Sequence, residues 1–139
     1  MAHEERSKKL KRLVAVQRQM EKMAEVELAD TTRHRAEVTQ NMSSVLEALG
    51  SVEPIHQIFS KHYSEQYGRL RLRDNQLASV QQFQENRVLR EKTKADRLED
   101  RMVEARDLEQ REIDDNAIFE LLEVMVATQT PASSKLGDS

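Results

Sequence analysis

Cysteine and tryptophan are absent from the 139 residues, and the chain has only three glycines and two prolines. The lack of cysteine excludes disulfides, thiolate nucleophiles and cysteine-bound zinc, and it fits a reducing compartment. With three glycines, neither a glycine-rich phosphate loop nor a nucleophile elbow can be assembled. We therefore expect a protein that is not an enzyme and that uses no cofactor.

A long apolar run and an excess of one charge are missing as well. No window reaches the roughly 20 apolar residues of a membrane span, and the opening MAHEERSKKLKRL is charged where a secretory signal would be apolar. Lysine and arginine number 22 against 25 acidic residues. We expect a soluble, cytoplasmic protein without membrane insertion or a small-molecule substrate, and the balance argues against nucleic acid as a partner.

One pair of residues has the spacing of a metal-ligand motif. The stretch EPIH, Glu53 to His56, matches the Glu-x-x-His pattern of di-iron helix bundles. That site needs a second copy of the motif and two further carboxylates, and the chain contains no second copy. We therefore expect no metal site.

The few helix breakers fall into two windows, which leaves two long segments. Gly50, Pro54 and Gly68 define the first window and Pro131 and Gly137 the second. The segment before the first window is expected to form a long helix over about 8–49. Steps of three and four residues give it a narrow coiled-coil seam, with a stutter where two steps of four follow each other. The predicted seam consists of Leu10, Leu13, Gln17, Met20, Ala24, Leu28, Thr31, Arg35, Val38, Met42, Val45 and Leu49.

The second long helix is expected to run from about 70 to 127, and its most apolar part is the end, AIFELLEVMVATQ. Placing that end against the apolar start of the first helix predicts an all-α, antiparallel two-helix hairpin. In this register Leu13 lies opposite Leu122, and Arg35 lies near Met102. Residues 1–127 then form a single coiled-coil domain, and the polar tail 128–139 is expected to be disordered.

This register leaves residues 50 to about 86 beyond the last paired turn, as a tip with its own short helix over about 54–67. Pro54 suits the first turn of that helix, and Gly68 would interrupt or end it. Aromatic side chains form a stripe along it. We expect them either to bind a partner or to form a small core covered by residues 70–86. The stripe comprises Phe59, Tyr63 and Tyr67, with Phe83 further along the chain.

Charged residues gather at the amino-terminal end and along the second helix. The cluster RSKKLKR contributes Arg6, Lys8, Lys9 and Lys11, which fit an acidic partner surface at least as well as phosphates. The run 91–115 alternates in sign along the helix and is interpreted as a solvated face, in which each exposed pair contributes about 0.3–0.5 kcal/mol.

The amino-terminal helix contains KLKRLVAVQRQMEKMAEVELAD, with an early leucine pair, a Gln/Arg-rich turn and then EKMAEVEL. In these features it resembles the FliJ/YscO family of flagellar and type III export proteins. Family members often have tryptophan in the second helix and a basic carboxyl terminus, and this chain has neither. The resemblance implies a coiled-coil stalk of the export ATPase, located at the base of a secretion apparatus.

On this sequence the resemblance implies two contact regions. The helix ends, with Arg6, Lys8, Lys9, Lys11, Leu121 and Leu122, would face the export ATPase. The tip, with Phe59, Tyr63, Tyr67 and Phe83, would face the export gate protein or export chaperones. Two alternatives stay open: a generic dimeric coiled-coil scaffold or adaptor, in which the same seam pairs between two chains of a homodimer, and a coiled coil associated with nucleic acid.

Overall fold

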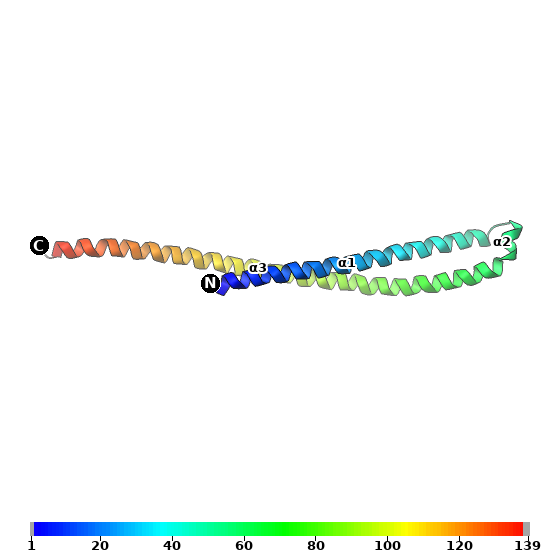
Figure 1. The fold of residues 1–139 in the computed structure, drawn as a ribbon, viewed down its shortest axis with the longest axis horizontal. Coiled ribbons are helices and arrows are strands. Elements are labelled where there is room, and N and C mark those ends of the chain that lie inside the picture. Colours follow the sequence, from blue (N-terminus) through cyan, green and yellow to red (C-terminus); the bar gives the residue numbers. More distant parts are fainter. Residues whose placement is uncertain (1, 138–139) are drawn as a thin grey trace. The chain divides into compact units, whose positions relative to one another are not determined.

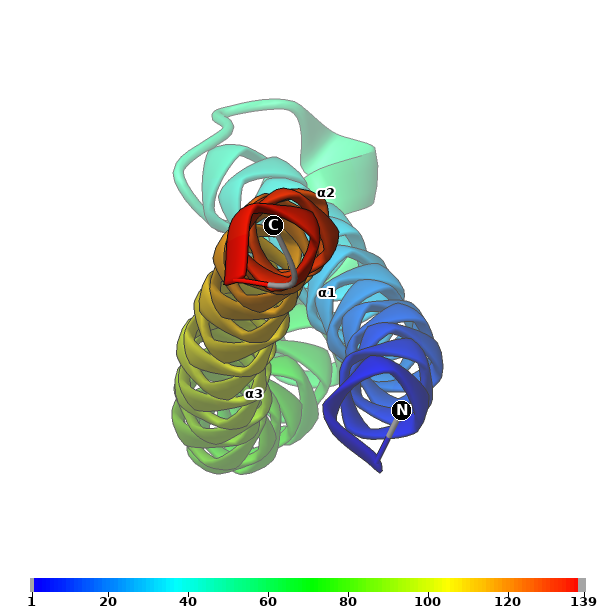
Figure 2. The same ribbon diagram turned by 90° about the vertical axis from the view of Figure 1, so that its left-hand side faces the viewer.

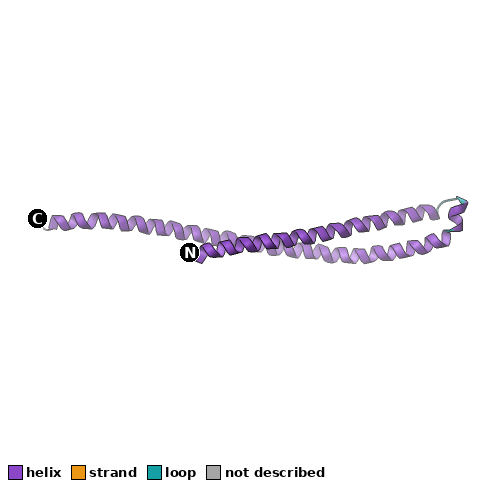
Figure 3. Cartoon of the chain, viewed as in Figure 1, coloured by secondary structure: helices purple, strands orange, loops and turns teal. Residues whose placement is uncertain are grey.

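Three helices account for nearly all of the chain in a computed structural model, which describes residues 2–137 and the side chains of residues 5–129. In order they are α1 (Ala2–Leu49), α2 (Pro54–Ile58) and α3 (Ser60–Gly137) (Figure 1). No strand occurs among the described residues, and the loop is confined to the short connection around α2 (Figure 3). The predicted all-α class is confirmed.

The connection between the long helices begins where the sequence predicts. Helix α1 ends at Leu49, and the Gly50 N–H donates a hydrogen bond to the Leu46 carbonyl at 3.0 Å. Pro54 is the first residue of α2. Its fixed φ and missing N–H suit that position, where no intrahelical acceptor is available.

The predicted tip is wrong in its extent. Helix α2 ends at Ile58 rather than near residue 67, and Phe59, with φ −97° and ψ 11°, is the only residue between α2 and α3. Gly68 lies inside α3, which runs without interruption through residues 70–86. One interior glycine costs a helix only about 1 kcal/mol relative to alanine. This cost is too small to end α3 at Gly68, where helical residues precede and follow it.

By its contacts the chain divides into two units, residues 16–95 and residues 1–15 together with 96–139. In the first unit α1 and α3 lie side by side in both views (Figures 1 and 2). Their less exposed residues recur in regular steps of three and four, the spacing of a heptad seam. The residues at these steps include Gln17, Glu21, Ala24, Leu28, Thr31, Arg35, Val38, Met42 and Val45 on α1, and Leu70, Asp74, Leu77, Gln81, Gln84, Val88, Glu91 and Ala95 on α3.

The predicted stutter is absent because two seam positions were misassigned. Met20 is exposed, and the neighbouring Glu21 takes its place in the seam. In the other unit Val14 likewise replaces Leu13, which is 51% exposed. There the seam consists of Ser7, Leu10 and Val14 on α1, and Leu98, Met102, Ala105 and Glu109 on α3.

Polar contacts give the pairing of the two long helices. In the first unit Gln17 donates to the Glu91 carbonyl at 3.2 Å and also to the Glu91 carboxylate. Further along, Arg35 donates to Asp74 at 3.0 Å. The residue number on α1 therefore rises as the number on α3 falls.

The predicted register is wrong by several turns of α3. Arg35 contacts Asp74 and Gln81, not the region of Met102. The unit that holds the chain ends has the same offset, because Ser7 donates to Glu109 at 2.8 Å. A short connection forces the first residues of α3 to lie near the last residues of α1, and this constraint overrides the match between the two most apolar blocks.

The predicted disordered tail also differs from the structure. Helix α3 continues from residue 128 to Gly137, and residues 138–139 lie outside the described residues. At 78 residues, α3 is much longer than α1, which has 48.

Gly68 offers a test of the continuous α3 helix. A Cβ at this position would meet no atom within 4 Å, so alanine fits without strain. We expect Gly68→Ala to stabilise the protein by about 0.5–1 kcal/mol, because alanine loses less backbone entropy in a helix. Thermal unfolding followed by circular dichroism measures the change. A lower melting temperature would indicate that Gly68 marks a break in the helix.

Ala95 tests the closeness of the two helices. It is 0% exposed and lies in the seam, whereas Ala29 is exposed on α1. Leucine at position 95 would overpack the seam, and we expect Ala95→Leu to cost about 1–3 kcal/mol. The matched change Ala29→Leu should stay within about 0.5 kcal/mol. Urea unfolding of both variants measures the difference, and equal stabilities would contradict the seam.

Candidate partner-binding surfaces

The aromatic residues of the predicted tip form a small cluster at the connection. The Tyr63 ring lies 6.4 Å from the ring of Phe59 and 5.8 Å from that of His56, between ring centroids. The Tyr63 hydroxyl lies 3.1 Å from His56 Nδ1, within hydrogen-bonding distance. His56 Nε2 is 3.6 Å from a carboxylate oxygen of Glu53. The Glu-x-x-His pair therefore lies in the connection and links it to the first turn of α3.

The four predicted tip residues separate into two environments. Tyr63 and Tyr67 are partly buried, and each continues the heptad spacing of the α3 seam. Phe59 and Phe83 are exposed, and Phe83 lies five turns of helix beyond Tyr63. The predicted cover by residues 70–86 does not form, because those residues belong to the same straight run of α3 as Tyr63 itself.

A second surface lies on α3 beyond the last contact with α1. Every residue from 110 to 129 is exposed, including the large side chains Phe119 (66%) and Leu121 (62%). We call residues 112–127 the acidic apolar segment, since they contain five carboxylates and no lysine or arginine. A helix that is apolar over most of its circumference is normally buried, whereas this segment is exposed along its whole described length.

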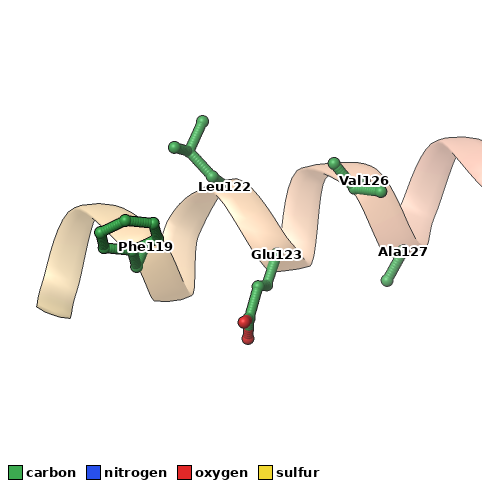
Figure 4. A pocket seen from close by; sticks show the side chains of 5 residues that line it. All are labelled: Phe119, Leu122, Glu123, Val126 and Ala127. Atoms are coloured by element: carbon green, nitrogen blue, oxygen red, sulfur yellow. The ribbon is translucent and has the colours of Figure 1, made fainter.

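Figure 4 shows the close arrangement of side chains on this segment. Phe119, Leu122, Glu123, Val126 and Ala127 line an open depression of ≈ 400 Å³ on the helix surface. Leu122 and Val126 project on the same side, and Glu123 points away from them. The depression thus offers an apolar floor with a carboxylate at its edge.

Leu121 and Leu122 do not pair with the start of α1 as predicted. Leu13 and Leu122 are each 51% exposed, and the residue of α3 that contacts the start of α1 is Glu109. The two leucines therefore belong to an open surface, not to a closed coiled coil. The sequence prediction also missed Ile118, Phe119, Met125 and Val126, although 117–127 is apolar except for Glu120 and Glu123 and could have identified them.

The basic residues Arg6, Lys8, Lys9 and Lys11 are exposed at the start of α1. Ser7 and Leu10, which alternate with them, are partly buried, and Ser7 contacts Glu109. This alternation directs the apolar seam toward α3 and the positive charge toward solvent. The basic start, residues 6–12, and the acidic apolar segment lie in the same unit of the chain.

Two further kinds of site were sought within the described residues. No three histidine, aspartate or glutamate side chains gather closely enough there to hold a metal ion. No helix in that part of the chain combines the length and the apolar character needed to cross a membrane. Comparison with protein-family models, curated proteins and solved structures found no match.

Substitution of Tyr63 tests whether the aromatic cluster at the connection stabilises the fold. Tyr63→Ala removes a partly buried ring and its hydrogen bond with His56, and we expect it to cost about 1–2 kcal/mol. Phe83 is 62% exposed, so Phe83→Ala should stay within about 0.5 kcal/mol. Urea unfolding followed by circular dichroism measures both. Equal losses would contradict the two environments described above.

Proposed function

We propose that the chain is a non-enzymatic, antiparallel coiled-coil hairpin that acts as a component of a bacterial flagellar or type III protein export apparatus. The observation that carries the proposal is the surplus length of α3, which leaves an apolar surface exposed on the described residues beyond Glu109. Such a surface suits helix-to-groove contacts with other proteins. The resemblance of residues 9–30 to the FliJ/YscO family supplies the identity of the apparatus.

The helix ends are proposed to contact the export ATPase. The acidic apolar segment, with Leu121 and Leu122, supplies the apolar part of this contact. The basic start supplies charge through Arg6, Lys8, Lys9 and Lys11. Buried aromatic and aliphatic anchors contribute most of the free energy of typical protein interfaces, whereas exposed charges mainly affect association rate and specificity.

The tip around α2 is proposed to contact the export gate protein or an export chaperone. Phe59 and, further along α3, Phe83 are its exposed aromatic residues, and Tyr63 and Tyr67 are partly buried at the spacing of the α3 seam. Exposed aromatic rings are enriched in protein interfaces because they bury a large area with few rotatable bonds.

The alternative of a generic dimeric scaffold places the two sides of the seam in different chains. In the structure Arg35 and Asp74 of one chain already occupy facing seam positions. This intrachain contact favours the hairpin. The dimeric scaffold remains the alternative if the chain binds neither the export ATPase nor the gate protein.

Binding to purified export ATPase and gate protein tests the proposal. We expect the double change Leu121→Ser and Leu122→Ser to reduce ATPase binding at least tenfold and to leave gate binding unchanged, since the two surfaces are separate. Phe59→Ala with Phe83→Ala should show the reverse pattern. Leu89→Ser is the control, because Leu89 is equally exposed but lies in neither surface.

The absence of binding to both proteins, together with normal export in a deletion strain, would overturn the export assignment. Loss of binding in the Leu89→Ser control would show that general stability, not the two surfaces, determines the result.

A further inference from the structure

The acidic apolar segment is not a simple continuation of the α1–α3 seam. Continuing the heptad steps from Glu109 leads to Glu112, Asn116, Phe119, Glu123 and Val126, of which only two are apolar. The larger apolar group lies elsewhere on the helix, at Ile118, Leu121, Leu122 and Met125, spaced as i, i+3, i+4 and i+7. A partner must therefore approach α3 from a side that α1 does not occupy.

The charge of the segment restricts what that partner can be. Asp114 and Asp115 are exposed on the same side of the helix as this apolar group, and no positive side chain lies among residues 112–129. Two copies of the segment facing each other would bring like charges together, which is unfavourable. The complementary partner is a helix with positive side chains and some apolar surface.

The chain itself carries such a helix face. Arg6, Lys9 and Arg12 recur every third residue along one side of the start of α1 and are exposed, and Leu13 beside them is exposed as well. Lysine and arginine also cover apolar surfaces with their aliphatic stems while their charged groups stay in water. The basic start thus matches the acidic apolar segment in charge and can bury part of its apolar face.

We propose that two copies of the chain form a two-fold symmetric dimer in which the acidic apolar segment of each copy packs on the basic start of α1 of the other. The basic start and the acidic apolar segment belong to one unit of the chain. The contact between Ser7 and Glu109 brings the basic start next to the part of α3 that directly precedes the acidic apolar segment. A two-fold axis between the blocks brings each onto its complement, which makes the contact self-complementary and closed.

The dimer needs no component of an export apparatus and does not rest on the proposed function. It covers the surface that the proposed function assigns to the ATPase, so the two interactions exclude each other. The experiments below use the purified full chain alone. Their failure would leave the ATPase interaction untouched, and failure of ATPase binding would leave the dimer untouched.

Sedimentation equilibrium of the full chain tests the dimer. We expect a monomer–dimer equilibrium at low salt whose dissociation constant rises about tenfold or more at high salt, because exposed charges are screened. Leu121→Ser with Leu122→Ser should give a monomer. Phe83→Ser is the control, since Phe83 is as exposed as Leu121 but lies outside both blocks. A monomeric wild-type chain, or a dimer that survives the leucine changes, would overturn the proposal.

Charge reversal tests which surfaces meet. Asp114→Lys with Asp115→Lys should give a monomer, and so should Lys9→Glu with Arg12→Glu. Mixing the two variants should restore a dimer. In the mixed dimer one contact pairs the two reversed surfaces, which are again opposite in charge, and the other contact pairs the two unchanged surfaces. Circular dichroism of each variant checks that the helices are intact. A mixture that stays monomeric while both variants keep full helicity would contradict the pairing.

Engineered cysteines provide a direct readout, since the native chain contains none. A Lys9→Cys chain mixed with an Asp115→Cys chain should form a disulfide-linked heterodimer on mild oxidation. Each chain alone should crosslink much less. Preferential crosslinking of Asp115→Cys with itself would overturn the proposal and indicate direct pairing of two α3 helices.

Discussion

The short connection between α1 and α3 determines which residues of the two long helices can meet. Only residues 50–59 separate them, and five of these form α2. The last turns of α1 must therefore lie beside the first turns of α3, and every later pair follows at the heptad spacing. Since α3 is longer than α1, the last residues of α3 extend beyond the residues that pair with α1. The exposed acidic apolar segment is a consequence of this constraint.

Large apolar side chains occupy fewer than half of the seam positions that follow from this register. Ala24, Ala95 and Ala105 are among its most buried residues, and small side chains allow two helices to approach closely. Polar residues occupy several other positions. Glu91 is only 8% exposed and accepts hydrogen bonds from Gln17, and Arg35 contacts both Asp74 and Gln81. A slip by one heptad would leave these groups without their partners, so the polar contacts favour one register at some cost in stability.

The distribution of charge connects this architecture to interaction with other molecules. The net charge of −3 conceals a basic start and an acidic apolar segment within the same unit. The basic start and the acidic apolar segment are complementary in charge. The acidic apolar segment also exposes many large apolar side chains. A contact that satisfies both blocks at once is therefore favourable, whether the partner is a second copy of the chain or another protein with the same pattern.

The amino-acid sequence by itself determined that the chain is helical, that α1 ends at Leu49 and that Pro54 begins a helix, because breakers and periodicity act locally. It did not determine the register, since Leu13 and Leu122 match each other in hydrophobicity although they do not meet. The seam position of Glu21 was beyond local reasoning about apolar residues, because a polar side chain is stable in a seam only beside a suitable partner. The heptad steps placed Arg35 in the seam but did not identify Asp74 as its partner. The tertiary structure decided these points through one physical constraint, the short connection, which places Asp74 opposite Arg35 and leaves the most apolar residues of α3 exposed.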